Sequence, residues 1–296
     1  MVATTRVATA ALLCMLGAAV FLAACNSKQP LVVGSKSDTE DMILGEIVAQ
    51  HLEHRLGRRV TRRTGLGDTP ILYQAILSGE VGIYPEYTGL IESDILKEQA
   101  NSDPQIVLTR VRQQMDRVQL EVLDPLGFDS PSAMVVRASG NETIASLSDA
   151  ADPAKTNKRW KLGVRDEFQA RSDGLQELAP YRLPMDSPHI LDPKQLFTAL
   201  AKGDVDMIAT RATDGHLTSA DWKILTDDKK VFPPYQACLL VRKDLIAADP
   251  ALRPAVAELS GKINADTMRK LNSQVDVQGM PAATVAAGFL SQAGLK

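Results

Sequence analysis

Two tyrosines lie where a short strand is expected to pass into the next helix. Residues 81–83 form an apolar run that is predicted to be a strand ending at Tyr84 and Pro85. Tyr87 follows, just before Thr88 and Gly89. In open α/β sheets, ligands bind at the carboxyl ends of the strands. We therefore expect a ligand-binding loop here, in a binding protein rather than an enzyme.

Residue patterns that carry catalysis or metal binding do not assemble in this sequence. There is no Gly-rich phosphate loop, no Gly-x-Ser-x-Gly elbow and no Cys-x-x-Cys pair. His51 and His54 have a spacing that could suit a metal, but their charged neighbours favour a solvated helix face. His189 and His216 lie in polar loops without a partner at ligand spacing. No catalytic residue, metal or cofactor is predicted.

The first 24 residues have the composition of an export signal. Arg6 is their only charge, and the apolar run from 8 to 23 is too short to span a membrane. Leu-Ala-Ala directly before Cys25 resembles a lipobox, the processing site of bacterial lipoproteins. That resemblance implies that Cys25 carries a lipid. The lipid would anchor the chain, outside the cytoplasm, to the bacterial cell membrane in the periplasm or at the cell surface, with residues 25–30 as a tether. A plain secretory peptide with an incidental cysteine is the alternative.

Composition limits the possible partners and the means of stabilisation. The formal net charge of −3 shows no basic excess of the kind that nucleic-acid binding requires. Cys238 is the only cysteine beyond Cys25, so no internal disulfide is expected despite export. A chain of 296 residues is long enough for two modest lobes, each with its own core.

Strands and helices are expected to alternate through the first hundred residues. Residues 31–33 and 60–64 are predicted strands, and the helix between them is expected to end near Gly57. A further helix begins near Pro70, which suits a first-turn position. This alternation predicts an α/β fold with a largely parallel sheet.

A second helix–strand unit resembles the first at a constant offset of 124 residues. Gly203 then corresponds to Gly79, Val205 to Val81, and Arg211 to Tyr87. Chance similarity between two such units is one explanation. The simpler explanation is two lobes of related architecture with a cleft between them, in which Tyr87 faces Arg211.

Two proline-marked segments are candidates for the crossings between lobes. They are residues 124–131 and 232–235, and each precedes a predicted strand, at 133–136 and 238–241. Helices in 249–296 would close the first lobe. The predicted organisation is a signal peptide, a tether, a first lobe, a second lobe and a return to the first lobe, at 1–24, 25–30, 31–127, 128–236 and 237–296.

Several motifs together resemble the glycine betaine/carnitine/choline-binding proteins of osmoprotectant ABC importers. The motifs are Gly34-Ser35-Lys36, Tyr84-Pro85-Glu86-Tyr87-Thr88-Gly89, Arg171-Ser172-Asp173-Gly174, Thr213-Asp214-Gly215 and Phe232-Pro233-Pro234-Tyr235. The resemblance covers nearly all of residues 25–296. It implies a monomeric, two-lobed periplasmic-binding-protein fold of type II, with a mixed, mostly parallel sheet in each lobe. It also implies delivery of a small-molecule ligand to a permease and its ATPase.

The family's ligand site is an aromatic cage around a trimethylammonium group, stabilised by cation–π attraction. The resemblance assigns two cage positions to Tyr87 and Tyr235. It adds Ser35, Thr88 and Thr213, which lie within the matching motifs, to the expected ligand contacts. Tyr84 is either a further contact or a wall residue.

This chain departs from the family pattern at four positions. Ser132 and Arg211 stand where the other two cage rings are usual, Asp41 where glutamine is usual, and Leu90 where threonine is usual. Losing two rings forfeits about 1–4 kcal/mol of cage stabilisation. Arg211 suits a carboxylate, phosphate or sulfonate, and Asp41 an amine or hydroxyl. The alternatives are a salt bridge from Arg211 to Asp214 or Glu86, and a surface position for Asp41.

The sequence therefore predicts the extracytoplasmic binding protein of an ABC importer, holding a small polar or zwitterionic solute that is not a typical quaternary ammonium. Three alternatives remain open at this point. The first is a ligand-sensing or adaptor lipoprotein without a transport role. The second is a conventional betaine or choline binder despite the altered cage, and the third is an enzyme built on the same scaffold.

Overall fold

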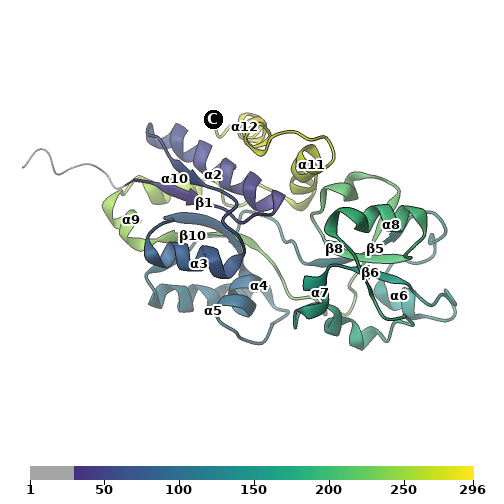
Figure 1. The fold of residues 1–296 in the computed structure, drawn as a ribbon. Coiled ribbons are helices and arrows are strands. Elements are labelled where there is room, and N and C mark those ends of the chain that lie inside the picture. Colours follow the sequence, from purple (N-terminus) through teal and green to yellow (C-terminus); the bar gives the residue numbers. More distant parts are fainter. Residues whose placement is uncertain (1–29) are drawn as a thin grey trace, which may run out of the picture. The chain divides into compact units, whose positions relative to one another are not determined.

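The computed structural model describes residues 30–296. The predicted signal sequence and the lipidation site Cys25 lie outside the described residues. Two five-stranded sheets organise the described chain, and the strand order of each brings distant parts of the sequence together. We call each sheet with its helices a lobe (Figure 1).

The sheet of the first lobe has the order β2-β1-β3-β10-β4. Its strands are β1 (Val32–Gly34), β2 (Thr61–Arg63), β3 (Ile83–Tyr87), β4 (Leu120–Val122) and β10 (Ala237–Arg242). β1 pairs in parallel with β2 and β3, whereas β10 is antiparallel to both β3 and β4. Only β10 therefore runs against the other strands.

The sheet of the second lobe repeats this plan with the order β7-β6-β8-β5-β9. Its strands are β5 (Ser132–Arg137), β6 (Leu162–Val164), β7 (His189–Ile190), β8 (Met207–Arg211) and β9 (Trp222–Leu225). Here β5 is the one reversed strand, antiparallel to both β8 and β9. The prediction of mixed, mostly parallel sheets is confirmed.

The internal offset of 124 residues also appears in the structure. β3 and β8 begin and end at positions that differ by that number. The helices before them, α3 (Thr69–Ser78) and α8 (Leu196–Lys202), end at Gly79 and Gly203. Both glycines have a left-handed backbone, with φ of 83° and 80°, which other residues adopt only with strain. The two lobes are related in architecture as predicted.

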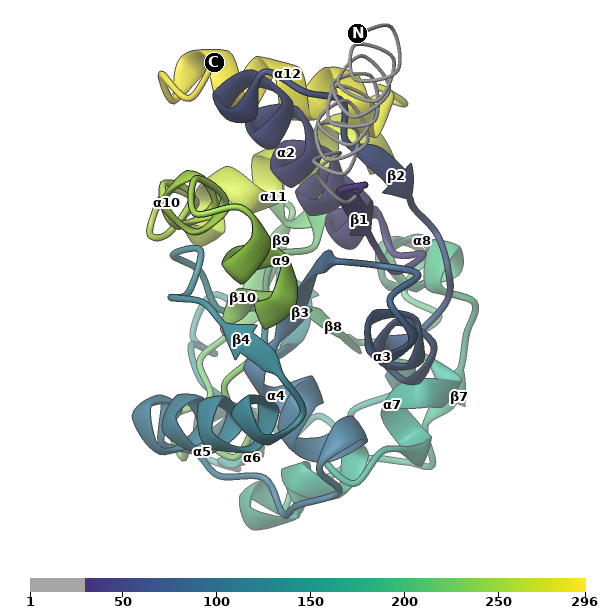
Figure 2. The ribbon, with the colours of Figure 1, turned by 90° about the vertical axis from the view of Figure 1, so that its left-hand side faces the viewer.

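Helices cover both faces of the first sheet (Figures 1 and 2). The apolar cluster on one face includes side chains of β1, β10, α2 and the C-terminal helices, and the cluster on the other face includes α3 and α5. The helices of this lobe are α2 (Thr39–Leu56), α3, α4 (Thr88–Leu90), a π-helix η1 (Ile91–Ile95), α5 (Pro104–Arg117), α9 (Lys243–Ala248), α10 (Leu252–Ala257), α11 (Ala265–Asp276) and α12 (Ala282–Gln292).

The second lobe has the same layering with shorter helices. One apolar cluster packs around Trp160 beneath α6, and another packs α8 against the opposite face. Its helices are α6 (Leu147–Ala151), α7 (Asp166–Ala170), α8 and the 3-10 turns η2 (Leu175–Tyr181), η3 (Pro193–Gln195) and η4 (Gly215–Thr218).

The chain passes between the sheets twice, at the two proline-marked segments. The first passage lies between β4 and β5 and the second between β9 and β10, and a bridge from Asp129 to Gln236 joins them. The boundaries at 127/128 and 236/237 fall within these passages and stay a prediction.

His189 lies at the start of strand β7 and His216 in the 3-10 turn η4, rather than in loops as expected. Two further local expectations are wrong. β3 does not end at Tyr84 but continues through Pro85 to Tyr87. Pro85 has no N–H to donate, but β1 pairs with β3 only at Ile83, so no hydrogen bond between strands is lost at position 85. The N–H of Tyr87, two residues on and on the same side of the strand, donates to the Glu86 side chain rather than to a neighbouring strand.

His51 is the second exception, because it is fully buried rather than on a solvated face. Its ring nitrogens lie 2.8 Å from the Ala255 carbonyl and 3.1 Å from the Leu295 carbonyl. Helix α10, which packs on α2, provides the Ala255 carbonyl, and the segment after α12 provides that of Leu295. His54 is exposed, as expected.

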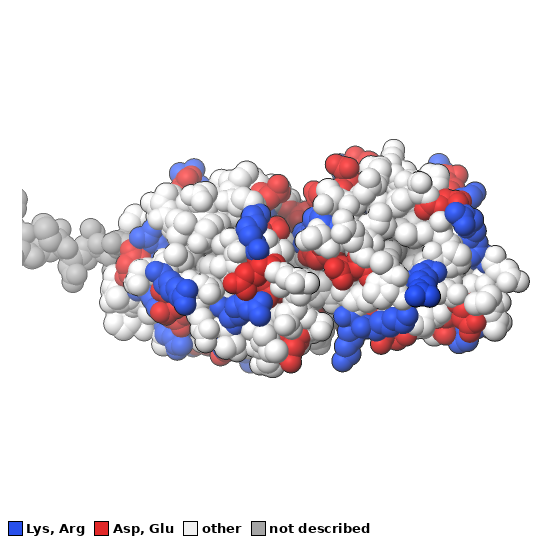
Figure 3. Space-filling model, turned by 90° about the horizontal axis from the view of Figure 1, so that it is seen from below, with Lys and Arg blue, Asp and Glu red and all other residues white. Residues whose placement is uncertain are grey.

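The helices between residues 30 and 296 are each too short or too polar to cross a membrane. Lysine and arginine alternate with aspartate and glutamate over the face seen in Figure 3. That face presents no extended field of one sign.

Candidate functional site

Tyr87, at the end of β3, is enclosed by cations and carboxylates of the chain itself. Its ring is fully buried, with Lys36 Nζ 4.7 Å and the Arg211 guanidinium carbon 5.1 Å from the ring centroid. Both are within cation–π range. Its hydroxyl donates to Glu40 Oε1 at 2.5 Å. The structure thus brings Tyr87 and Arg211 together, as the internal offset predicted.

Lys36 follows β1 and is itself buried between two carboxylates. Its ammonium donates to Glu86 Oε1 at 2.5 Å and lies 3.4 Å from Asp41 Oδ1. Burial lowers the pKa of Lys36, but Asp41 and Glu86 outweigh it, and the pKa is raised overall. Lys36 therefore stays charged beside the Tyr87 ring.

Arg211 ends β8 opposite Ser132, its partner on β5. Within residues 30–296 the nearest ion-pair partner of its guanidinium is Asp38, at 3.9 Å, whose side chain is 56% exposed. Neither Asp214 nor Glu86 is its partner, so that alternative is wrong. So long and exposed a pair holds the guanidinium only weakly.

Glu86 and Asp214 accept hydrogen bonds from groups other than Arg211. Glu86 accepts from Lys36 and, at 3.0 Å, from Thr69. Asp214 accepts from the Thr210 hydroxyl at 2.6 Å and from the backbone N–H of His216 at 2.9 Å. Arg211 is therefore left facing the space between the lobes.

Tyr235 lies in the second passage between the lobes and is covered by an arginine of its own. The guanidinium carbon of Arg171 is 5.6 Å from the Tyr235 ring centroid, and Arg171 also donates to the Tyr235 hydroxyl. The pocket beside it, lined by Ser132 and Arg211 among others, has a volume of about 50 Å³. That volume suits a water molecule or two rather than a solute.

A larger cavity is also lined by Arg211, and we call it the cleft cavity. Its volume is about 590 Å³, within the range of small-molecule sites. It is lined from both lobes by Ser37, Asp38, Thr39, Glu40, Asp41, Arg165, Pro193, Lys194, Leu196, Thr210, Arg211, Thr213, Asp214, His216, Asn272 and Asp276. Charges of both signs therefore face one space.

Asp41 is the most unusual member of this lining. It lies in the first turn of α2 and is 1% exposed, so the surface alternative is wrong. Burial raises the pKa of its carboxyl to about 7, against the opposing effect of Lys36.

The remaining predicted ligand residues have structural partners. The Ser35 and Thr88 hydroxyls are buried and accept from the backbone N–H groups of Gly65 and Gln236, at 3.4 and 3.2 Å. Thr213 lines the cleft cavity, but its hydroxyl is 2.5 Å from that of Ser130.

Tyr84 belongs to the apolar cluster that packs α3 and α5 on the first sheet. Tyr87 belongs to the cluster on the opposite face. Tyr84 therefore packs as a wall residue, and we do not include it in the proposed ligand site.

Helix α11 of the first lobe closes one side of the cleft cavity against η4 of the second. Asn272 Nδ2 donates to Glu40 Oε2 at 2.7 Å and to the Thr213 carbonyl at 2.8 Å. Arg269 Nε donates to the Ala212 carbonyl at 2.7 Å. These contacts fix α2, the segment directly after β8, and α11 around the same cavity.

Sequence reasoning missed four residues that organise the site: Lys36, Glu40, Glu86 and Arg171. Three of them lie inside the motifs that carry the family resemblance, so the signal was present. Their roles were hidden because the pairing of a buried charge depends on which elements meet.

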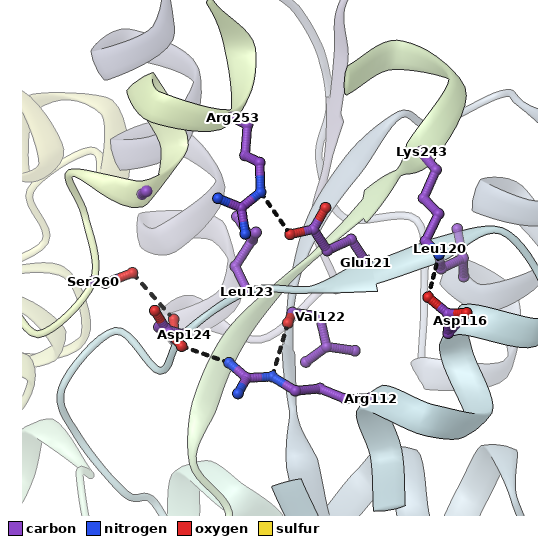
Figure 4. Close-up of a pocket in the computed structure, with 11 residues that line it drawn as sticks. Arg112, Asp116, Leu120, Glu121, Val122, Leu123, Asp124, Lys243, Arg253 and Ser260 are labelled. Carbon is purple, nitrogen blue, oxygen red and sulfur yellow. Dashed lines mark hydrogen bonds and ion pairs between the residues drawn. The ribbon is translucent and has the colours of Figure 1, made fainter. Parts of the chain in front are cut away.

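A separate hollow lies on the first lobe, beside edge strand β4 (Figure 4). Its charged side chains are paired with one another: Arg112 with Asp124 at 2.6 Å, Arg253 with Glu121 at 2.9 Å, and Lys243 with Asp116. Mutual pairing leaves this hollow without a charge free for a ligand. No group of three or more metal-ligating side chains forms within residues 30–296.

Comparison with known proteins gives a consistent result over nearly the whole chain. Residues 29–292 match the model of a family described as the substrate-binding domain of ABC-type glycine betaine transport systems. The chain is 31% identical over 293 residues to a glycine-betaine-binding protein of Pseudomonas aeruginosa, covering 95% of this chain and 93% of that protein. It is 29% identical over 289 residues to the carnitine transport binding protein OpuCC of Listeria monocytogenes, covering 94% of each.

A solved structure supports the same fold. A crystal structure described as a glycine betaine/carnitine/choline ABC transporter superimposes with a TM-score of 0.82 at 26% identity, covering 90% of this chain and 99% of that one. The predicted two-lobed periplasmic-binding-protein fold of type II is confirmed.

Proposed function

We propose that this chain, which belongs to the family of substrate-binding domains of ABC-type glycine betaine transport systems, captures a small polar or zwitterionic solute whose anionic group lies on Arg211. The observation that carries the proposal is the position of Arg211. Its guanidinium lines the cleft cavity, and the ion pair it makes among residues 30–296 is a weak one to Asp38 at 3.9 Å. A planar guanidinium binds a carboxylate, phosphate or sulfonate through paired hydrogen bonds.

The two tyrosines of the predicted cage support a solute other than a typical quaternary ammonium. Lys36 and Arg211 lie over the Tyr87 ring, and Arg171 lies over the Tyr235 ring. A trimethylammonium group would have to displace a cation of the protein to reach either ring. It would also meet the repulsion of Arg211 in the same cleft.

The family's systems import their solutes, and the chain acts as their binding component rather than as an enzyme. We propose that it delivers its solute to an ABC permease and the ATPase that drives it. We also propose that it is a monomer with lobe boundaries at 127/128 and 236/237. A lipid on Cys25 anchors it to the bacterial cell membrane on the extracytoplasmic side, in the periplasm or at the cell surface.

Native mass spectrometry of the protein purified with its endogenous ligand tests the role of Arg211. We expect a bound solute with an anionic group, and a loss of affinity of about 10- to 100-fold in Arg211→Ala, as for a charge-assisted pair. Arg159→Ala is the matched control, because Arg159 is a 67% exposed arginine of the second lobe outside both cavities.

Two results would contradict the proposal. One is unchanged affinity of Arg211→Ala for the endogenous ligand. The other is sub-micromolar calorimetric affinity of the unaltered protein for glycine betaine, choline or carnitine, which would show a conventional binder of this family.

A further inference from the structure

Asp41 lines the cleft cavity with both carboxylate oxygens lacking a hydrogen-bond partner among the described residues. Its residue exposure is 1%. Lys36 is 3.4 Å away as an ion pair, but its hydrogen bond goes to Glu86. Asp41 thus has a positive charge nearby but, among the described residues, no hydrogen-bond donor for either carboxylate oxygen.

The other two buried carboxylates of this region are satisfied. Glu40 accepts from the Tyr87 hydroxyl and from the Asn272 side chain. Glu86 accepts from Lys36, Thr69 and the Tyr87 backbone N–H. A buried ionised group without donors is strongly unfavourable, so the exception at Asp41 calls for a donor from the cavity side.

We propose, on the basis of the proposed function, that Asp41 is a specificity-determining residue that accepts a hydrogen bond from an N–H of the ligand. The ligand class is then a zwitterion with an anion on Arg211 and an ammonium that keeps at least one hydrogen. A fully methylated ammonium attracts the carboxylate by charge but has no hydrogen to donate. Its methyl groups would remove water from Asp41 without replacing the lost hydrogen bonds.

Pairs of ligands that differ only in methylation test the inference directly. They are glycine with glycine betaine, β-alanine with β-alanine betaine, and γ-aminobutyrate with γ-butyrobetaine. Within a pair the anion and the carbon chain are the same, and the three lengths sample the separation between Arg211 and Asp41. Calorimetry on the ligand-stripped protein should show, for the best-fitting pair, about 10- to 100-fold tighter binding of the primary amine.

Two variants at Asp41 identify the residue responsible. Asp41→Leu keeps a similar volume without an acceptor, and it should abolish or reverse the preference for the primary amine. Asp41→Asn keeps one acceptor oxygen without the charge, and it should reduce the preference even if the leucine variant does not fold. Asp186→Asn, at a half-exposed position paired with Arg159, is the control that should retain it.

The outcomes separate this inference from the proposed function. Equal or tighter binding of the trimethyl member in every pair that binds would overturn the inference, and when glycine betaine binds more weakly than the sub-micromolar range it leaves the role of Arg211 intact. An unchanged preference in both Asp41 variants would also overturn it. If none of the six compounds binds, the inference fails, while the proposed function is still decided by the endogenous ligand and Arg211→Ala.

Discussion

Replacing Gly215 with alanine should force apart the contact between η4 and α11. A Cβ atom at Gly215 would lie 2.5 Å from Ser273 N and 2.7 Å from both Ser273 Cα and Asn272 C. All three are backbone atoms, so no side-chain rotation relieves the overlap. One segment must move away from the other.

The cost follows from the contacts that this movement disturbs. Overpacking of a tight contact destabilises a protein by about 1–3 kcal/mol. The movement also stretches the hydrogen bonds from Asn272 to the Thr213 carbonyl and from Arg269 to the Ala212 carbonyl, each worth about 0.5–1.5 kcal/mol. We expect a loss of about 2–4 kcal/mol in the free energy of unfolding.

Urea denaturation measures that loss, and hydrogen exchange locates it. Exchange should rise in residues 213–218 and 265–276 and stay unchanged in the sheet cores. Gly288→Ala is the control, because a Cβ there meets nothing within 4 Å and alanine favours the helix. A Gly215→Ala protein within about 0.5 kcal/mol of the unaltered chain, the usual limit for a neutral surface change, would contradict this prediction.

Two further predictions concern the carboxylates and tyrosines around the site. Tyr87→Phe should lower the free energy of unfolding by about 1.5–3 kcal/mol because Glu40 loses a hydrogen-bond donor. Tyr84→Phe should be nearly neutral because the Tyr84 hydroxyl has no partner among the described residues. Thermal unfolding compares the two variants, and equal losses would contradict the assignment. The Asp41 carboxyl faces Lys36, Glu86, Arg211 and Asp38, and its pKa in the folded state is about 7, against an ordinary 3.8. Between about pH 4 and 7 the folded state therefore keeps a proton that the unfolded state has released. The free energy of unfolding falls as the pH rises through that range. Asp41→Asn should therefore be more stable than the unaltered protein at pH 8, by on the order of 2–4 kcal/mol, and nearly equal to it at pH 4; urea denaturation showing the same difference at both pH values would rule this out.

The fold was largely predictable because its signals are local. Apolar periodicity and the left-handed glycines Gly57, Gly79 and Gly203 mark helix ends. The two proline-marked segments coincide with the passages between sheets. Strand β3 was misjudged because it runs through a proline, and the absence of β1 pairing beyond Ile83 is what makes that proline acceptable.

The site was predictable in its members but less so in their roles. The offset of 124 residues placed Arg211 opposite Tyr87, and the structure puts its guanidinium 5.1 Å from that ring. The alternative partners of Arg211 were wrong because Asp214 is engaged by Thr210 and His216, its neighbours in sequence, whereas Glu86 is engaged from distant segments. Whether these residues contact the ligand stays a prediction.

The sequence by itself determined the two-lobed α/β architecture, the family and the departures at Asp41, Ser132 and Arg211, because each depends on residue identity and local periodicity. Only the tertiary structure decided which charges meet. Hydrogen bonding and burial of a carboxylate depend on every element that packs around it, and α2, β3, β8 and α11 converge here from distant parts of the chain. That convergence pairs Glu40 and Glu86 within the protein and leaves Asp41, buried beside them, facing the cleft cavity without a donor.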